Sequence, residues 1–185
     1  RSELAQAYLL AVWAGKQALA GKSTDPKTTA LILSTTKTDF EDFEDTLAPK
    51  KAECGRRFNP GAMAADIAEQ LEIEGPAYAV SNACASGIIA IMQGARLLQR
   101  QSVQHALVIG VDILSDFIFN GFSCLRALSP NPAKPFDKAR DGLSLGEGAA
   151  AVLLTRSTGY SSDPTIRGWA ATNDAAHITA PSREG

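Results

Sequence analysis

Cysteine and histidine are scarce in this sequence, and their scarcity excludes several kinds of site. The three cysteines, Cys54, Cys84 and Cys124, are widely spaced and odd in number. They therefore predict neither a disulfide framework nor a zinc knuckle, and we expect no metal site. Free thiols are typical of a reducing compartment, and the opening residues do not have the pattern of a secretory or transit peptide. These two features lead us to expect a cytoplasmic protein.

The chain also lacks an excess of charge and a long apolar run. Its net charge is −2 over 185 residues, which gives no broad attraction to nucleic acid or to an anionic membrane surface. No apolar run is long enough to cross a bilayer. A hydrophobic content of 45% is ordinary for a globular protein of one domain, or a large part of one. We therefore expect neither nucleic acid nor membrane as a partner.

Short apolar strands alternate with helices along the chain. Buried strands are predicted at 30–34, 106–111 and 149–154, with a further strand at 78–80 and an edge strand at 166–170. Helices are predicted over 2–20, from Asn59-Pro60 to about residue 71, and after Cys84. This order favours a layered α/β fold with a mostly parallel or mixed sheet. The helix after Cys84 has only a narrow polar side, so we expect it to lie deep in the protein.

The segment with the most chemical information surrounds Cys84. An extended run at 75–80 leads into a turn of small residues, then the cysteine, then an apolar helix. A sulfur at the start of a helix lies near backbone N–H groups without helical partners, and the helix dipole there favours a thiolate. The small neighbours leave room for a substrate. Cys84 is therefore our candidate nucleophile.

Other conspicuous residues have simpler interpretations. Cys124 is predicted to be a small core residue, and His105, among polar residues before a strand, is predicted to lie at the surface. Phe117, Phe119 and Phe122 fit either core packing or the lining of an apolar tunnel, and the sequence does not separate the two. The first helix has no strand before it, and the last residues are predicted to form a loop with no element after it. We therefore expect a piece of a longer protein.

Four motifs together resemble the β-ketoacyl synthases, the condensing enzymes of fatty acid and polyketide synthesis. They lie in the family's order along most of the chain, which makes the resemblance specific. The motifs are the cysteine segment Gly75–Gly87, the P-F-D-x-x-R-D-G segment Pro135–Gly142, the G-E-G-A turn within Leu145–Ala149, and the D-A-x-H-x-T-x-P loop Asp174–Pro181. Residues 82–87 also resemble thiolases, which share the fold but lack the second and third motifs.

The resemblance implies a fold and a set of functional residues. We expect a thiolase-like layered α/β/α fold in which residues 1–185 form the N-terminal half of a two-half condensing enzyme, truncated at both ends. In this family the two catalytic histidines lie in the second half, so His177 is given no catalytic role here. His177 and Thr179 are implied as pocket residues, together with Phe119 if it lines the tunnel.

A second group of residues is predicted to support the structure of the site. Asp137, Arg140 and Asp141 lie in a loop rich in glycine and proline, where a buried ion-pair network is the expected role. Glu147, between two glycines, is expected to accept hydrogen bonds from backbone or arginine donors in that network.

The activity implied by the resemblance is a decarboxylative condensation. Cys84 would take an acyl group from an acyl carrier protein, and a malonyl thioester on a second carrier would lengthen it. No cofactor is implied, because phosphopantetheine arrives on the carrier protein. The alternatives are a non-catalytic partner of the chain-length-factor kind, which typically lacks the nucleophile, and a thiolase-type acyltransferase. We also expect a homodimer, or a heterodimer with a related subunit, with the strand at 108–111 as the candidate pairing edge.

Overall fold

The computed structural model describes residues 6–38, 59–156, 162–176 and 182. Cys54, His177 and Thr179 lie outside these ranges. In chain order the elements are α1 (Gln6–Leu19), the short 3-10 helix η1 (Pro26–Thr28), β1 (Thr29–Ser34), α3 (Pro60–Gln70), β2 (Ala77–Val80), α4 (Ser86–Gln99), β3 (His105–Asp112), α5 (Asp116–Cys124) and β4 (Gly148–Thr155).

The four strands form one mixed sheet in the order β2-β1-β3-β4. β1 pairs in parallel with β2 on one side and with β3 on the other, whereas β4 runs antiparallel to β3. The prediction of a mixed sheet is confirmed. The proposed pairing edge at 108–111 is wrong, because β3 is hydrogen-bonded along both of its edges and has no free one to offer.

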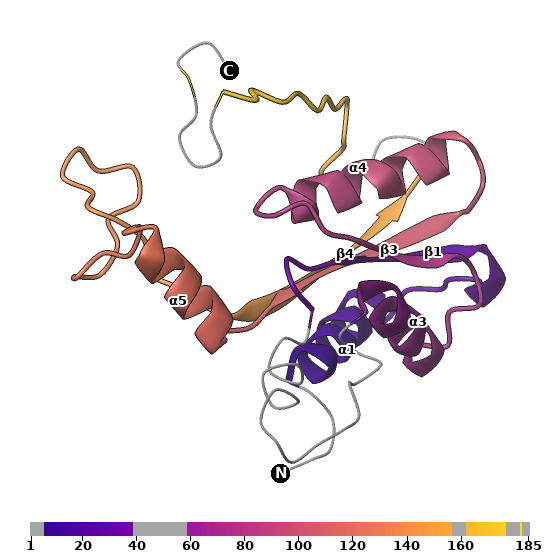
Figure 1. Ribbon diagram of the computed structural model, residues 1–185. Coiled ribbons are helices and arrows are strands. Elements are labelled where there is room, and N and C mark those ends of the chain that lie inside the picture. The colour runs from indigo at the N-terminus through magenta and orange to yellow at the C-terminus, as the bar shows by residue number, and fades with distance from the viewer. Residues whose placement is uncertain (1–5, 39–58, 157–161, 177–181, 183–185) are drawn as a thin grey trace, which may run out of the picture.

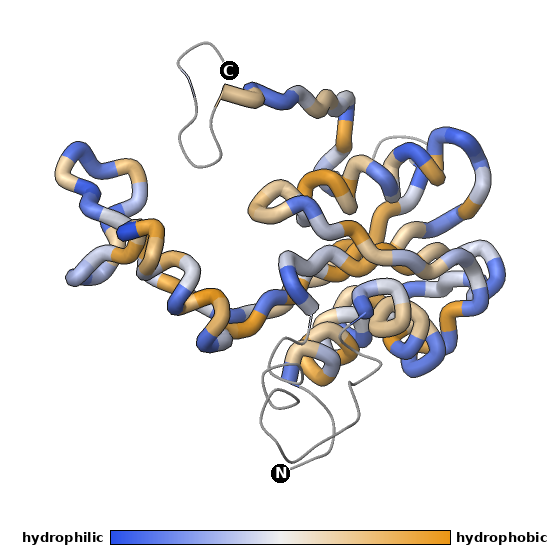
Figure 2. The backbone as a smooth tube through the Cα atoms, in the orientation of Figure 1, coloured by the Kyte–Doolittle hydropathy of each residue, from blue (hydrophilic) through white to orange (hydrophobic). Residues whose placement is uncertain are grey.

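Helices cover both faces of this sheet, which gives three layers (Figure 1). Alternate side chains of a strand point to opposite faces, and β1 shows this directly. Leu31 and Leu33 pack into the cluster with α1 and α3, and Ala30 and Ile32 pack into the cluster with α4. Figure 2, which colours the chain by residue hydropathy, shows hydrophobic residues concentrated in these central strands. The predicted α/β/α layering is therefore confirmed.

The helices begin where their capping residues predict. Asn59 Oδ1 accepts hydrogen bonds from the N–H groups of Gly61 (2.9 Å) and Ala62 (3.2 Å), and Pro60 occupies the first helical position of α3. Ser115 caps α5 in the same way, through the N–H of Ile118. Local sequence therefore fixes the starts of these two helices.

Two elements are less buried than their sequences predict. The helix α4 packs one face on the sheet but leaves its opposite face open, and Ile88 is 75% exposed. The strand β4 was expected to be buried, yet its residues alternate between exposed and half-buried, and Val152 is 43% exposed. Both differences have one cause: among the described residues nothing packs on that side of α4 or pairs with the outer edge of β4.

The predicted edge strand at 166–170 is absent from the described part of the chain, where these residues have an irregular backbone. The prediction for His105 is also wrong in part. This residue is half-buried at the start of β3, and its Nδ1 atom is buried without a hydrogen-bond partner.

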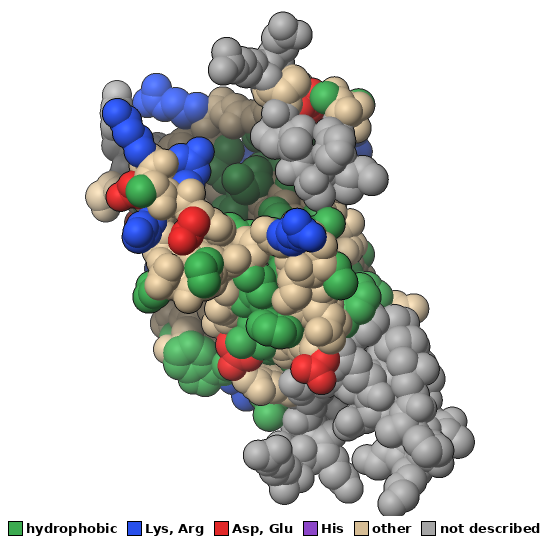
Figure 3. Space-filling view, turned by 60° about the vertical axis from the view of Figure 1, so that its left-hand side comes forward, with side chains coloured by type: hydrophobic (Ala, Val, Ile, Leu, Met, Phe, Trp, Pro, Cys, Tyr) green, Lys and Arg blue, Asp and Glu red, His purple; other side chains and the backbone are tan. Residues whose placement is uncertain are grey.

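The helix α5 and the loop after it project away from the three layers (Figure 1). No residue of α5 is buried, so the prediction that Cys124 is a core residue is wrong. Phe117 and Phe119 are also exposed, so core packing within the described chain does not account for them. Figure 3, which turns this side forward, shows hydrophobic side chains gathered on the surface. Such a surface is normally covered in a stable protein.

In the part of the chain that the structure describes, no helix has the length and apolarity to span a membrane.

The close packing of α4 on the sheet depends on Gly94. A Cβ atom added there would lie 2.9 Å from Leu154 Cδ1 and 3.3 Å from both Ala106 Cβ and Ile32 Cδ1. We expect Gly94→Ala to lower the free energy of unfolding by about 1–3 kcal/mol through overpacking, as measured by urea denaturation.

Gly121 in α5 is the matched control, because a Cβ atom there meets nothing within 4 Å. Gly121→Ala should leave stability unchanged or raise it by up to about 1 kcal/mol through helix propensity. Equal effects at the two glycines would contradict the packing of α4 described here.

Candidate functional site

The carboxyl ends of the three parallel strands meet at one edge of the sheet. Residues 35–38 follow β1, residues 81–85 follow β2, and residues 113–115 follow β3. Ligands in open α/β sheets bind at this edge. Cys84 therefore lies where such a fold carries out its chemistry, directly before α4, as the sequence predicts.

The turn that carries Cys84 is held by Ser86. The Ser86 Oγ donates a hydrogen bond to the Ala83 carbonyl (2.6 Å) and accepts one from the Asn82 N–H (2.7 Å). Ala83 has a φ of 46°, a left-handed conformation that costs a non-glycine residue about 1–2 kcal/mol. The buried serine thus holds the backbone just before Cys84 in a conformation that it would not otherwise prefer.

The start of α4 differs from the starts of α3 and α5. Its N-cap residue, Ala85, makes no side-chain capping hydrogen bond, whereas Asn59 and Ser115 cap their own helices. Cys84 is exposed beside this start. The first turn of a helix directs N–H groups without helical partners outward, where they stabilise negative charge. The arrangement suits a nucleophile that attacks a carbonyl, whose oxygen then becomes negative.

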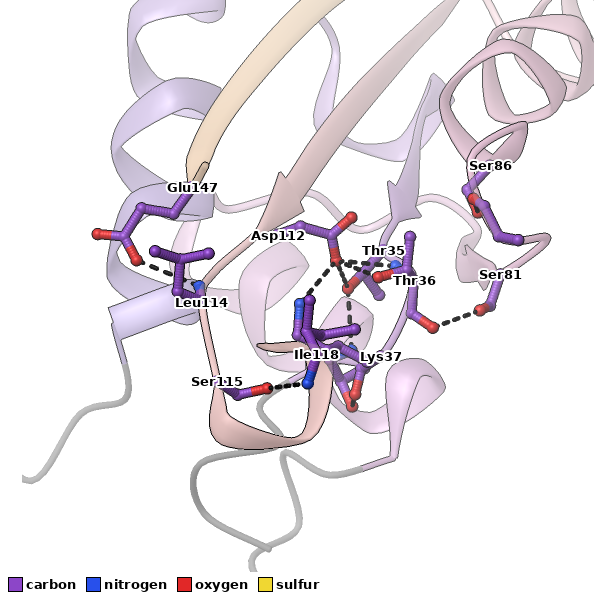
Figure 4. A network of polar contacts seen from close by, with 12 residues as sticks. Thr35, Thr36, Lys37, Ser81, Ser86, Asp112, Leu114, Ser115, Ile118 and Glu147 are labelled. Atoms are coloured by element: carbon purple, nitrogen blue, oxygen red, sulfur yellow. Dashed lines mark hydrogen bonds and ion pairs between the residues drawn. The ribbon is translucent and has the colours of Figure 1, made fainter. Parts of the chain in front are cut away.

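A polar network at the same edge was not predicted from the sequence (Figure 4). Asp112, the last residue of β3, accepts three hydrogen bonds at Oδ1: from the Thr36 Oγ1 (2.8 Å), the Thr36 N–H (2.9 Å) and the Thr35 Oγ1 (3.2 Å). The Lys37 Nζ lies 3.8 Å from the same oxygen. The signal in the sequence is that Thr35-Thr36-Lys37 and Asp112 each stand where a buried parallel strand ends.

Glu147 joins three parts of the fold just before β4. Its Oε1 accepts a hydrogen bond from the Gln6 Nε2 (2.9 Å), and its Oε2 accepts one from the Leu114 N–H (3.2 Å). Glu147 therefore has the backbone donor that was predicted. Its side-chain donor is the glutamine Gln6, where an arginine was the predicted alternative.

The other three residues of the predicted network are exposed and make local contacts. Asp137 accepts from the Ala139 N–H (2.7 Å), Arg140 donates to the Asp137 carbonyl (2.9 Å), and Asp141 accepts from the Ser129 hydroxyl (2.6 Å). The prediction of a buried ion-pair network is wrong. The loop projects with α5 away from the sheet, so the described chain supplies no core around these side chains.

Of the predicted pocket residues, the structure places only Phe119, which is 55% exposed on α5. His177 and Thr179 lie outside the described residues. A pocket of about 340 Å³ lies beside α1 and α3, lined by Tyr8, Asp66, Glu69, Gln70 and Glu72, and it includes none of the predicted site residues. Within the described ranges, no three His, Cys, Asp or Glu side chains are grouped to hold a metal ion.

Tyr78 stands in the strand that leads to Cys84. Burial raises the pKa of its hydroxyl above the ordinary value of 10.0. A tyrosine is already neutral at physiological pH at its ordinary pKa, and the shift is in the direction that keeps it so, so this side chain adds no charge near the turn.

Comparisons with known proteins point to one family. The family model described as "Beta-ketoacyl synthase, N-terminal domain" matches residues 5–159. The chain is 32% identical over 145 residues to "Putative polyketide beta-ketoacyl synthase 1" of Streptomyces cyaneus, a match that covers 72% of this chain and 34% of the relative. It is 31% identical over 137 residues to "3-oxoacyl-[acyl-carrier-protein] synthase 2" of Staphylococcus aureus, covering 68% and 34%.

Solved structures give the same result. The ketosynthase ApeO in complex with its chain length factor ApeC, from Xenorhabdus doucetiae, has a TM-score of 0.64 at 30% identity, covering 78% of this chain and 38% of that one. The ishigamide ketosynthase/chain length factor has a TM-score of 0.71 at 28% identity, covering 82% and 42%.

The chain spans about a third of the length of the curated relatives it matches. The match to the family model nevertheless covers most of the chain, including Cys84 and the strands on either side of β1. The protein belongs to the β-ketoacyl synthase family and carries its N-terminal domain.

Proposed function

We propose that this chain supplies the nucleophile of a condensing enzyme that extends acyl groups held on a carrier protein. The observation that supports the proposal best is the exposed Cys84 at a helix start that no side chain caps, in a chain that belongs to the β-ketoacyl synthase family. A chain-length-factor-like partner would not need this cysteine.

In the first step, the Cys84 sulfur attacks the carbonyl carbon of an acyl thioester. The bond between that carbon and the carrier's phosphopantetheine sulfur breaks, and the carrier thiolate leaves and takes up a proton. The carbonyl oxygen is negative in the intermediate, and we assign the Cys84 N–H as one donor that stabilises it.

In the second step, a malonyl group on another carrier loses CO₂ and becomes an enolate. The enolate carbon attacks the acyl carbonyl, the Cys84 sulfur leaves, and a β-ketoacyl group longer by two carbons remains on the carrier. This step needs the two histidines that the family resemblance assigns to the second half. The N-terminal domain therefore supplies the nucleophile for the transfer step, and the second half supplies the histidines for the condensation.

We assign His177, Thr179 and Phe119 to the pocket for the acyl chain and the pantetheine arm, on the family resemblance. The partners we propose are acyl and malonyl carrier proteins and a second synthase subunit, identical or related. The reaction needs no resident cofactor, and a reactive thiol is best kept in the cytoplasm, where thiols stay reduced.

The transfer step can be tested by intact-mass spectrometry of the full-length protein after incubation with an acyl carrier protein thioester. We expect one acyl adduct on the wild type and on Cys124→Ala, and none on Cys84→Ala, because of the two cysteines that the structure describes Cys84 is the one at a helix start.

Cys124 is a matched control because it is also exposed but lies in the last turn of α5. An adduct that survives Cys84→Ala would assign the nucleophile elsewhere. The absence of any adduct on folded wild-type protein would favour the non-catalytic partner.

The role of Ser86 gives a second test. Ser86→Ala removes both hydrogen bonds that hold the Cys84 turn, and each intramolecular hydrogen bond contributes about 0.5–1.5 kcal/mol to stability. We expect a fall of that size in the free energy of unfolding, together with slower acylation of Cys84. Ser102→Ala, at an exposed serine just after α4, should change neither quantity; equal effects of the two substitutions would refute the assignment.

A further inference from the structure

We propose that Asp112 is a positioning residue for Cys84, acting across the sheet through Thr36 and Ser81. The inference rests on the proposed function, and it assigns a task to a carboxylate that the transfer step itself does not use. Asp112 ends β3, whereas Cys84 follows β2, and the two strands are separated by β1.

The first part of the connection runs from β3 to the segment after β1. Asp112 Oδ1 holds the backbone N–H and the hydroxyl of Thr36 at 2.9 and 2.8 Å and the hydroxyl of Thr35 at 3.2 Å. Hydrogen bonds to a charged acceptor are stronger than neutral ones. One oxygen therefore fixes both the path of the backbone and two side chains directly after β1.

The second part runs from that segment to the turn of the nucleophile. The Thr35 N–H donates to the Val80 carbonyl (3.3 Å), and the Ser81 hydroxyl donates to the Thr36 carbonyl (3.2 Å). Figure 4 shows Thr36 between the two, with Ser81 directed toward it from one side and Asp112 from the other. Ser81 is followed by Asn82, whose N–H is held by Ser86. The turn is thus held at two points. Ser86 of α4 holds Asn82, and Ser81 bonds Thr36, which is held in turn by Asp112.

Lys37 completes the arrangement. Its side chain is only 6% exposed and its Nζ lies 3.8 Å from Asp112 Oδ1. A nearly buried ammonium needs an opposite charge, and the Asp112 carboxylate, whose side chain is 38% exposed, supplies one at the β1 end. This requirement explains why a carboxylate stands at the end of an otherwise apolar strand.

These contacts would affect the reaction through the position of the Cys84 sulfur. A nucleophile that is displaced by about 1 Å from its productive position can lose about a hundredfold in rate. If Asp112 acts through Thr36 and Ser81, its removal should slow acyl transfer at saturating donor. The KM for the donor should stay nearly unchanged, because the polar contacts of Asp112 are with Thr35, Thr36 and Lys37.

The test is a double-mutant cycle between Asp112→Ala and Ser81→Ala in the full-length protein, read as the rate of acylation of Cys84 by an acyl carrier protein thioester. We expect Asp112→Ala to lower the saturated rate by about tenfold or more and Ser81→Ala to lower it by about threefold or more. The double variant should be no slower than Asp112→Ala alone, since both act along one path.

Two further variants separate positioning from general support of the fold. Asp112→Asn keeps an Oδ1 acceptor for Thr36 and should recover a rate within about threefold of wild type. Asp25→Ala is the matched control: Asp25 also accepts two hydrogen bonds, from the Lys27 N–H and the Thr28 hydroxyl, but before the opposite end of β1. It should lower stability without slowing the acylation of Cys84.

Independent, multiplicative effects of the two alanine substitutions would overturn the inference, as would a wild-type rate in Ser81→Ala when Asp112→Ala fails to fold. If the wild type forms no acyl-Cys84 at all, the proposed function fails instead. The same cycle is then read from the rate of Cys84 alkylation by iodoacetamide, where non-additive slowing supports the positioning role and additive or absent slowing contradicts it.

Discussion

The structure depends on the parallel pairing of β1 between β2 and β3. All six residues of β1 are buried, so its hydrogen bonds and its register cannot shift without moving apolar side chains between the two cores. The pairing brings three carboxyl ends to one edge, and each end contributes to one arrangement: Cys84 after β2, the Thr35–Lys37 segment after β1, and Asp112 on β3. The chemistry at Cys84 therefore depends on contacts far apart in the sequence.

Much of the fold could be predicted because local sequence and burial agree. Continuous apolar runs predicted β1 and β3, and Asn59-Pro60 predicted the start of α3. The failures share a cause. Apolar residues in β4 and α4, and Cys124 at the end of α5, were expected to be buried. An apolar side chain predicts that it is covered, but it does not predict which segment covers it. In the described chain Val152, Ile88 and Cys124 remain exposed.

The sequence predicted the local part of the candidate site and missed the part that depends on strand pairing. The small-residue turn before an apolar helix located Cys84, since a helix start is a local feature. Asp112 was missed because its partners lie 76 and 77 residues earlier in the chain, and only the pairing of β1 with β3 brings them together. The loop of Asp137, Arg140 and Asp141 shows the opposite error: charged residues close in sequence predicted ion pairs, whereas the backbone and a serine satisfy them.

The central claim is that the helix start beside Cys84 is arranged for an acyl group. A crystal structure of the full-length protein after reaction with an acyl thioester would test it most directly. The account predicts continuous density from the Cys84 sulfur, with the acyl oxygen about 2.7–3.1 Å from the Cys84 N–H and the Thr36–Ser81 contact retained. An acyl group on another residue, or an acyl oxygen directed away from the backbone N–H, would contradict it.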